Sequence, residues 1–231
     1  MLSLTRFHLS GYVRSLRAFQ PLLAITLLAV LVFLGSPGTP DRVTTLKLIV
    51  GGYGDSAALL FPVWAWAARG LLDTEPDGQR ELSALAAGRI RAPAAALLAA
   101  YILNVSLGVL LFAVPLVNGL SAGVPAPALW TAVALHLVVA VPATLLGALT
   151  SHAVLSSTAV SILVLLSGCV ALLLLSMGPL SPVSIPMIEW LRAAHEGPGR
   201  FTSAFPGVAA HIALWSAVAG AGYAMARRGR P

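Results

Sequence analysis

The sequence has little charge of either sign. Only 10% of its 231 residues are Asp, Glu, Lys or Arg, whereas soluble domains carry about 25%. In the same chain 58% of the residues are hydrophobic, and the mean hydropathy is +0.90. This composition excludes an ordinary soluble globular domain and predicts an integral membrane protein.

Cysteine and metal-binding patterns are also scarce. The one cysteine, Cys169, cannot form a disulfide within the chain, and its apolar neighbours predict a small buried side chain. No histidine lies three or four positions from another, so we expect neither a helical metal-binding pair nor a cofactor. The histidines are His8, His136, His152, His195 and His211.

Sequence motifs of enzymes are missing as well. The nucleotide-binding sequence G-x-x-x-x-G-K-[ST] does not occur, so the chain is not expected to hydrolyse nucleotides by itself. Neither G-x-S-x-G nor H-E-x-x-H occurs, and we expect no enzyme and no catalytic residue. The net charge of +6 comes almost wholly from arginine. In a chain this apolar it predicts anchoring at a lipid bilayer rather than nucleic-acid binding.

Long apolar runs predict six transmembrane helices. The expected fold class is therefore all-α, a polytopic membrane protein with one transmembrane domain over residues 1–231. The first run is short for a bilayer and is expected to borrow length from the helix before it. The predicted spans are Gln20–Gly35, Ser56–Leu72, Ala94–Val117, Ala128–Leu149, Thr158–Met177 and Gly207–Ala226.

The distribution of basic residues predicts the orientation. Six spans place both termini on the same side, which would carry ten arginines, whereas four basic residues (Arg42, Lys47, Arg192 and Arg200) would lie on the other. Cytoplasmic segments are enriched in Lys and Arg, so we expect both termini in the cytoplasm and the protein in the cell membrane. A five-span arrangement would separate the termini and remove this argument.

Residues 1–19 are predicted to form an amphipathic helix that lies in the membrane interface. One side of this helix would be apolar and the other basic. The apolar side would carry Leu9, Tyr12, Val13, Leu16 and Phe19, and the polar side Arg6, Ser10, Arg14 and Arg17.

The segment 73–93 joins the second and third predicted spans and holds four of the eight acidic residues. It must lie in water, because a charged side chain in hydrocarbon costs about 2.5–3.5 kcal/mol. Thr74 followed by Asp77 suggests a capping box, and Leu82 and Leu85 recur at helical spacing, so a short helix is expected. These residues leave open whether it is a solvated loop or contacts a soluble partner.

Two further segments are expected outside the spans. Residues 36–55 are predicted to be a loop, with Leu46–Val50 left open as the start of the next span. Within it Gly51–Asp55 resembles the Thr-Val-Gly-Tyr-Gly-Asp filter of potassium channels. The register is shifted and the filter threonine is missing, so a glycine turn is the preferred interpretation and an ion channel the lesser alternative. Residues 178–206 are expected to be extracellular, with a helix over Ser184–His195 lying on the membrane surface.

Several polar side chains fall within or beside predicted spans. Arg69 is expected to extend its charge to the interface. Asn104, Ser106 and His136 could line a polar path, and hydrogen bonding between helices is the plainer interpretation. His136 also leaves open a small intramembrane enzyme, although the sequence offers no paired acids, nucleophile or metal cluster for it.

The order of these segments resembles the membrane subunit of type-2 ABC exporters, the ABC-2 permease family. Members of that family have an interfacial helix, six spans, cytoplasmic termini, a polar helical segment between spans two and three, and broken extracellular helices before the last span. The nearest local match is Glu75–Leu82 followed by Arg89 and Pro93. It is similar to the acidic-Gly-Leu-Pro run that leads into span three of the family.

The resemblance implies a permease subunit that is driven by a separate ABC ATPase subunit. It also implies a second permease copy, identical or not, with an export path between the copies. Because the spans carry little charge, an amphipathic or apolar substrate is expected. The residues that the resemblance places against the ATPase are Glu75, Asp77, Arg80, Glu81, Arg6, Arg14 and Arg17.

Overall fold

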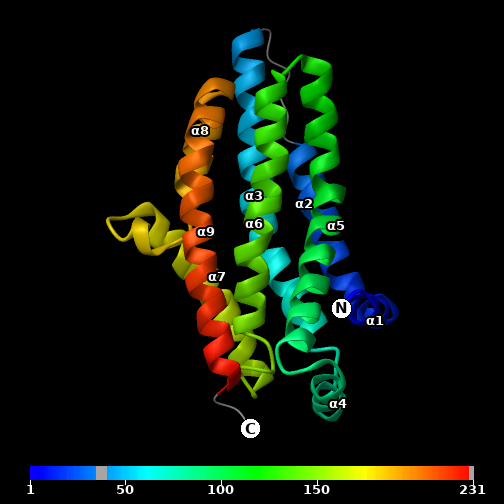
Figure 1. Ribbon diagram of the computed structural model, residues 1–231. Helices are drawn as coiled ribbons and strands as arrows, with labels where there is room; N and C mark the ends of the chain where they lie inside the picture. The colour runs from blue at the N-terminus through cyan, green and yellow to red at the C-terminus, as the bar shows by residue number, and fades with distance from the viewer. Residues whose placement is uncertain (35–40, 229–231) are drawn as a thin grey trace.

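The computed structural model describes residues 1–34 and 41–228, apart from the side chains of residues 31–34, 77 and 228. These residues are almost entirely helical and include no strand, so the expected all-α class is confirmed (Figure 1). The elements are α1 (Leu2–Arg14), η1 (Leu16–Ala18), α2 (Phe19–Leu34), α3 (Arg42–Leu72), α4 (Asp77–Ala87), α5 (Arg91–Ala122), α6 (Ala126–Leu149), α7 (Thr158–Met177), η2 (Ser181–Val183), α8 (Met187–Glu196) and α9 (Pro198–Arg228).

Five of the described helices, α3, α5, α6, α7 and α9, are long and apolar enough to cross a membrane. They indicate a multi-pass membrane protein. A sixth candidate is the pair of α1 and α2, which bend by 81° at their junction, so that α1 lies across the direction of α2 (Figure 1). Helix α7 coincides with the predicted fifth span, whereas α5 and α9 begin earlier than expected, at Arg91 and Pro198.

Helix α3 forms the centre of the bundle. It is buried along most of its length, from Val50 to Leu72, and packs against α5, α6 and α8. Its large side chains Tyr53, Phe61 and Trp64 are almost fully buried in the main hydrophobic core.

The prediction of a loop before Ser56 is wrong for the described residues 42–55, because α3 already begins at Arg42. Asp41 caps its N-terminus by accepting hydrogen bonds from the Thr44 amide at 2.9 Å and the Thr44 hydroxyl at 2.8 Å. These bonds hold the pKa of the Asp41 carboxyl below its usual value. Since Gly51–Asp55 is helical, its carbonyls bond amides one turn on and cannot form the ring of carbonyls that an ion filter needs.

The sequence predicted that this segment lies on the membrane surface. Instead, helix α8 packs lengthwise between α3 and α9 (Figure 1). The missing side chain of Gly54 lets the α8 backbone approach, and the Trp190 indole donates a hydrogen bond of 3.3 Å to the Gly54 carbonyl. One turn further, His195 Nε2 donates to Asp55 Oδ1 at 3.0 Å. Of the glycines that suggested a turn in the sequence, Gly51 and Gly54 therefore form a helix-packing surface.

Helix α1 buries one narrow side against the rest of the protein, and part of the side expected to be apolar stays exposed. Thr5, His8 and Tyr12 are buried, whereas Val13 is 65% and Leu16 82% exposed. Arg6, Arg14 and Arg17 are exposed as well. Thr5 faces α5, where its hydroxyl donates to the Ala95 carbonyl at 3.4 Å, so contacts with neighbouring helices decide which side of α1 is buried.

We predict that Gly54→Ala destabilises the fold and that Gly52→Ala does not. A Cβ at Gly54 would lie 2.9 Å from the Ala194 Cβ, whereas a Cβ at Gly52 meets no atom within 4 Å. Overpacking costs about 1–3 kcal/mol, while a helical Gly→Ala replacement in open space gains up to about 1 kcal/mol. Unfolding of the purified variants in detergent measures both, and equal stability would contradict the packing of α8 on α3.

Candidate functional site

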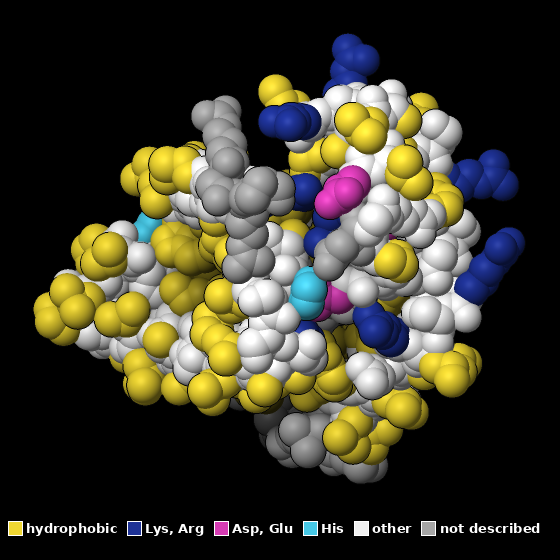
Figure 2. Space-filling view, turned by 90° about the horizontal axis from the view of Figure 1, so that it is seen from below, with side chains coloured by type: hydrophobic (Ala, Val, Ile, Leu, Met, Phe, Trp, Pro, Cys, Tyr) yellow, Lys and Arg dark blue, Asp and Glu magenta, His cyan; other side chains and the backbone are white. Residues whose placement is uncertain are grey.

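The end of the bundle that carries α1, α4 and the C-terminal end of α9 is here called the lower end (Figure 1). Many of the charged residues belong to these segments. Seen from below, basic side chains stand along one side of this end, with acidic and histidine side chains nearer its centre (Figure 2). The opposite end, where α8 joins α9, is called the upper end.

Helix α4 stands below α5 at the lower end and is tied to the end of α3 (Figure 1). Arg80 Nη2 donates to the Leu72 carbonyl at 3.4 Å and to the Glu75 carbonyl at 3.0 Å. The Ser83 hydroxyl donates to Glu75 Oε1 at 2.6 Å. These contacts fix the first turns of α4 to the connection that precedes it.

The capping box expected at Thr74 is not formed. The Thr74 hydroxyl instead donates to the Gly70 carbonyl at 2.9 Å, and Pro76 occupies the N-cap position without a side-chain hydrogen bond. Thr74 therefore closes the end of α3, because its hydroxyl reaches the carbonyl one turn back more easily than an amide beyond Pro76. The side chain of Asp77 lies outside the described part of the chain.

The outward face of α4 is apolar and uncovered. Leu82 is 66% and Leu85 84% exposed, and Glu81 beside them is also exposed. Ile90, in the connection to α5, is 79% exposed. An exposed apolar stripe on a short polar helix is typical of a surface that another protein covers.

His8 joins α1 to this arrangement and was not recognised in the sequence. It is buried and lines a small cavity with Glu75, Arg80 and Ser83. Burial lowers the pKa of His8; Glu75 acts in the opposite direction, and Arg80 lowers it further. A histidine in a helix has the same local sequence pattern whether it faces lipid, water or protein. Only the packing of α1 therefore shows that His8 is buried.

A buried polar network lies at the lower end of α3. Arg69 is only 8% exposed and does not extend to the interface, contrary to the expectation from the sequence. Its Nε donates to the Ser161 hydroxyl at 2.5 Å, and its Nη2 lies 3.4 Å from Asp73 Oδ2. Ser161 donates in turn to the Thr150 carbonyl, and the His152 amide donates to Asp73 Oδ1 at 2.6 Å. The network joins α3 to α7 and to the connection before α7.

The three polar residues expected near a path are not brought together. Asn104 is fully buried and its Nδ2 donates to the Thr144 hydroxyl at 2.9 Å, which links α5 to α6. Ser106 is exposed and donates to the Ile102 carbonyl of its own helix. Two positions along a helix differ by about 200°, so Asn104 and Ser106 point in opposite directions.

His136 lies inside the bundle between α3, α5 and α6. Its Nδ1 donates to the Ala132 carbonyl at 2.8 Å, its Nε2 shares a hydrogen bond of 3.0 Å with the Ser56 hydroxyl, and its ring packs 4.1 Å from that of Phe112. Both ring nitrogens are thus used within the protein. Ser56 was missed in the sequence, because only the packing of α3 against α6 places it opposite His136.

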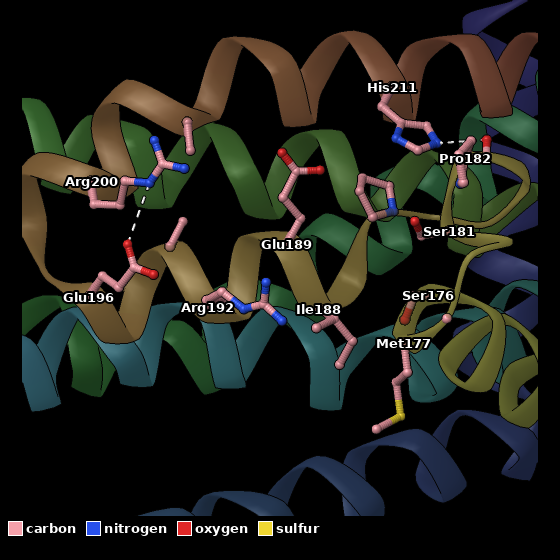
Figure 3. Close-up of a pocket in the computed structure, with 14 residues that line it drawn as sticks. Ser176, Met177, Ser181, Pro182, Ile188, Glu189, Arg192, Glu196, Arg200 and His211 are labelled. Atoms are coloured by element: carbon pink, nitrogen blue, oxygen red, sulfur yellow. Dashed lines mark hydrogen bonds and ion pairs between the residues drawn. The ribbon is translucent and has the colours of Figure 1, made fainter.

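A cavity of about 520 Å³ lies nearer the upper end, between α8, α9 and η2 (Figure 3). Glu189 extends from α8 toward α9, and Glu196 pairs with Arg200 at 3.4 Å. His211 Nε2 donates to the Pro182 carbonyl at 3.1 Å. The sequence did not indicate this cavity, because its walls come from segments up to thirty-five residues apart, Ser176 to His211.

The position of this cavity along α9 bears on whether it holds water. His211 lies thirteen residues after the start of α9 and seventeen before its end, so the short 3-10 turn η2 that it contacts is about 20 Å along that helix. Irregular backbone at membrane depth is tolerated where it is covered by protein or lines water. Its charged lining favours water in this cavity.

Comparisons with protein-family models, curated proteins and solved structures found no match. The interpretation of these regions therefore rests on their geometry. Among the described residues no group of three or more His, Cys, Asp or Glu side chains is placed to hold a metal ion.

We predict that acid weakens the folded state through His8. Its folded-state pKa is lowered, so the unfolded chain, in which the pKa is about 6.5, binds more protons in acid. The contribution of His8 to the free energy of unfolding is fully present above a pH of about 6.5. It is lost as the pH drops through the folded-state pKa, by at most about 1.4 kcal/mol per pH unit. The melting temperature between pH 7.5 and 5.5 should fall less in His8→Gln than in the wild type. His211→Gln is the control, and equal losses in the wild type and His8→Gln would contradict the prediction.

We also predict that the cavity between α8 and α9 is reached by water. In a Cys169→Ala background, a cysteine replacing His211 should react with a membrane-impermeant charged thiol reagent from one side of the membrane. A cysteine replacing Val109, which is 61% exposed near the middle of α5, faces lipid and should stay unlabelled. Labelling that is equal at the two positions, or absent at position 211, would contradict a water-filled cavity.

Proposed function

We propose that this chain is the membrane-spanning permease subunit of an ATP-driven ABC-2 type exporter in the cell membrane. The observation that carries the proposal is α4, a short helix tied to the end of α3 whose apolar stripe, Leu82 and Leu85, is uncovered. A helix that merely closed a connection would turn such side chains toward its own protein. An ABC ATPase subunit is the partner proposed for this stripe.

In this proposal α2 completes a set of six spans, α1 lies in the interface, and the lower end is cytoplasmic. The basic residues on α1, around the start of α5 (Arg89 and Arg91) and in the last turn of α9 support that orientation. Arg42, Lys47, Arg192 and Arg200 belong to the upper end, which would be extracellular.

The contacts at the lower end suggest how work done by the ATPase would reach the spans. A push on α4 passes to the end of α3 through Arg80 and to α1 through the packing around His8 and Glu75. The network of Arg69, Asp73 and Ser161 connects the same end of α3 to α7. The first three spans, α2, α3 and α5, would then tilt and open a path beside α7.

A second permease copy, identical or different, is proposed beside α7 and α9. Three residues of α7 are buried, Ser161, Leu165 and Ser176, and Leu163 and Leu174 are 66% and 60% exposed. Helix α9 carries small residues at four-residue steps, which allow close approach of another helix. These are Ala209, Ala213, Ala217 and Ala221.

The substrate is proposed to be amphipathic or apolar, and no cofactor is required. Of the path candidates, Ser106 faces outward from the bundle, whereas Asn104 and His136 are used in contacts between helices. The two buried residues therefore support the walls of a path rather than its surface.

One observation favours a second candidate, an intramembrane enzyme. Ser56 and His136 lie 3.0 Å apart, the separation of a nucleophile and its base. Both are buried, and the other partner of His136 is a backbone carbonyl instead of a carboxylate. The enzyme candidate would be removed if the His136→Ala variant kept the full catalytic activity of the wild type.

The proposal predicts that Leu85→Glu disrupts ATPase binding. A buried charge in the centre of an interface removes the apolar contact, and truncation of such central residues weakens binding by about 2 kcal/mol or more, at least about thirtyfold. The chain would be co-expressed with an ATPase that carries the nucleotide-binding sequence G-x-x-x-x-G-K-[ST] and is encoded next to it. Co-purification of the two proteins and ATP-dependent export from vesicles would then be measured.

Leu120→Glu supplies the matched control, because Leu120 is 61% exposed at the upper end of α5. It should retain ATPase binding. Glu81→Arg, at an exposed position beside the stripe, should allow ATP hydrolysis while export is lost. Unchanged binding and export in both Leu85→Glu and Glu81→Arg would overturn the proposal.

A further inference from the structure

A second cavity at the lower end lies beside the network of Arg69 and Asp73. It measures about 330 Å³ and lies where α1 turns into α2, beside the lower end of α3 and the start of α7. We call it the elbow cavity. Its lining includes Tyr12, Arg17, Trp66, Arg69, Asp73 and Thr158.

The elbow cavity has an excess of positive charge. Arg69 and Asp73 form an ion pair at 3.4 Å, so the carboxylate is balanced by one guanidinium group. Arg17 donates to the backbone carbonyl of Asp73 at 3.0 Å and has no carboxylate partner among the described residues. Two cations against one anion leave a net positive site for an anionic group.

The cavity also offers unused hydrogen-bond donors at two depths. A guanidinium group has five N–H donors, and the contacts above use one of Arg17 and two of Arg69. Arg69 is more than nine-tenths buried on the floor, whereas Arg17 is exposed at the rim. Burial raises the pKa of Tyr12 to about 12, and its hydroxyl donates to the Arg17 carbonyl at 3.4 Å, so the free donors of the cavity belong to the two arginines.

Apolar surface begins at the edge of the same cavity. Trp66, in its lining, is 40% exposed, and tryptophan favours the boundary between lipid and water. Along α2, Leu23 and Leu27 are 68% and 69% exposed, one and two turns after Gln20 in the lining. A ligand that fits both parts has an anionic head and apolar chains.

We propose that the elbow cavity binds the phosphate headgroup of an anionic membrane lipid. Arg17 and Arg69 donate to the phosphate oxygens, and the acyl chains lie along α2. Basic pockets between membrane-spanning helices bind such headgroups through charge and hydrogen bonds together. This site depends on membrane insertion and not on the proposed transport function.

The test uses quenching of Trp66 fluorescence by lipids with brominated acyl chains. The full-length chain is reconstituted in phosphatidylcholine vesicles that contain brominated phosphatidylglycerol or brominated phosphatidylcholine. Subtracting the signal of Trp66→Phe isolates Trp66 from the other four tryptophans. The wild type should show quenching at Trp66 at severalfold lower amounts of phosphatidylglycerol than of phosphatidylcholine.

Arg17→Gln should reduce this preference about fivefold, the effect of one basic residue at an anionic lipid surface. Arg14→Gln, an exposed arginine on the same helix outside the cavity lining, is the matched control and should keep the preference. Both positions are exposed, so the two variants should fold. Equal preference in Arg17→Gln and the wild type would overturn the proposal.

Inorganic phosphate at millimolar concentration distinguishes the two sources of a phosphate group. It should not relieve quenching by phosphatidylglycerol, because it lacks the apolar chains that the α2 surface holds. Full displacement by inorganic phosphate, or no preference between the two lipids in the wild type, would overturn a lipid site.

Discussion

The packing of α3 against its neighbours is the constraint on which the rest of the structure depends. Glycines in its upper half admit α8, and its lower half ends in the buried network of Arg69 and Asp73. Helix α3 continues from Arg42 to Leu72 with Pro62 inside it, so its upper and lower ends belong to one element. A movement of α4 would therefore act on α3, a helix that packs against its neighbours along most of its length.

The polar groups of the bundle divide into two kinds. Asn104 with Thr144, and His136 with Ser56, join neighbouring helices within the core. In contrast, Glu189, Arg200 and His211 line a cavity at the broken segment between α7 and α9 (Figure 3). The polar pairs in the core are stable at membrane depth because their members hydrogen-bond to one another. The charged side chains of the cavity need water or protein partners and are not stable in hydrocarbon.

The lower end combines two surfaces with different chemistry. The stripe of Leu82 and Leu85 is apolar and stands away from the bundle on α4, which suits a soluble protein partner. The elbow cavity is basic and lies beside exposed apolar side chains of α2, which suits a lipid. Arg17 and Arg80 both contact the short connection after α3, so the two surfaces meet at the same backbone.

The helical class, the five long apolar helices and the short helix after Asp73 could be predicted from the amino acids alone. These features follow from local composition and from helical spacing, which each segment carries alone. In contrast, the packing of the helices against one another shows that Gly51–Asp55 is helical, that α8 packs against α3, and that Arg69 is buried. A glycine or a charged residue has the same local pattern whether it meets water or another helix. Its role depends on which distant segment packs against it.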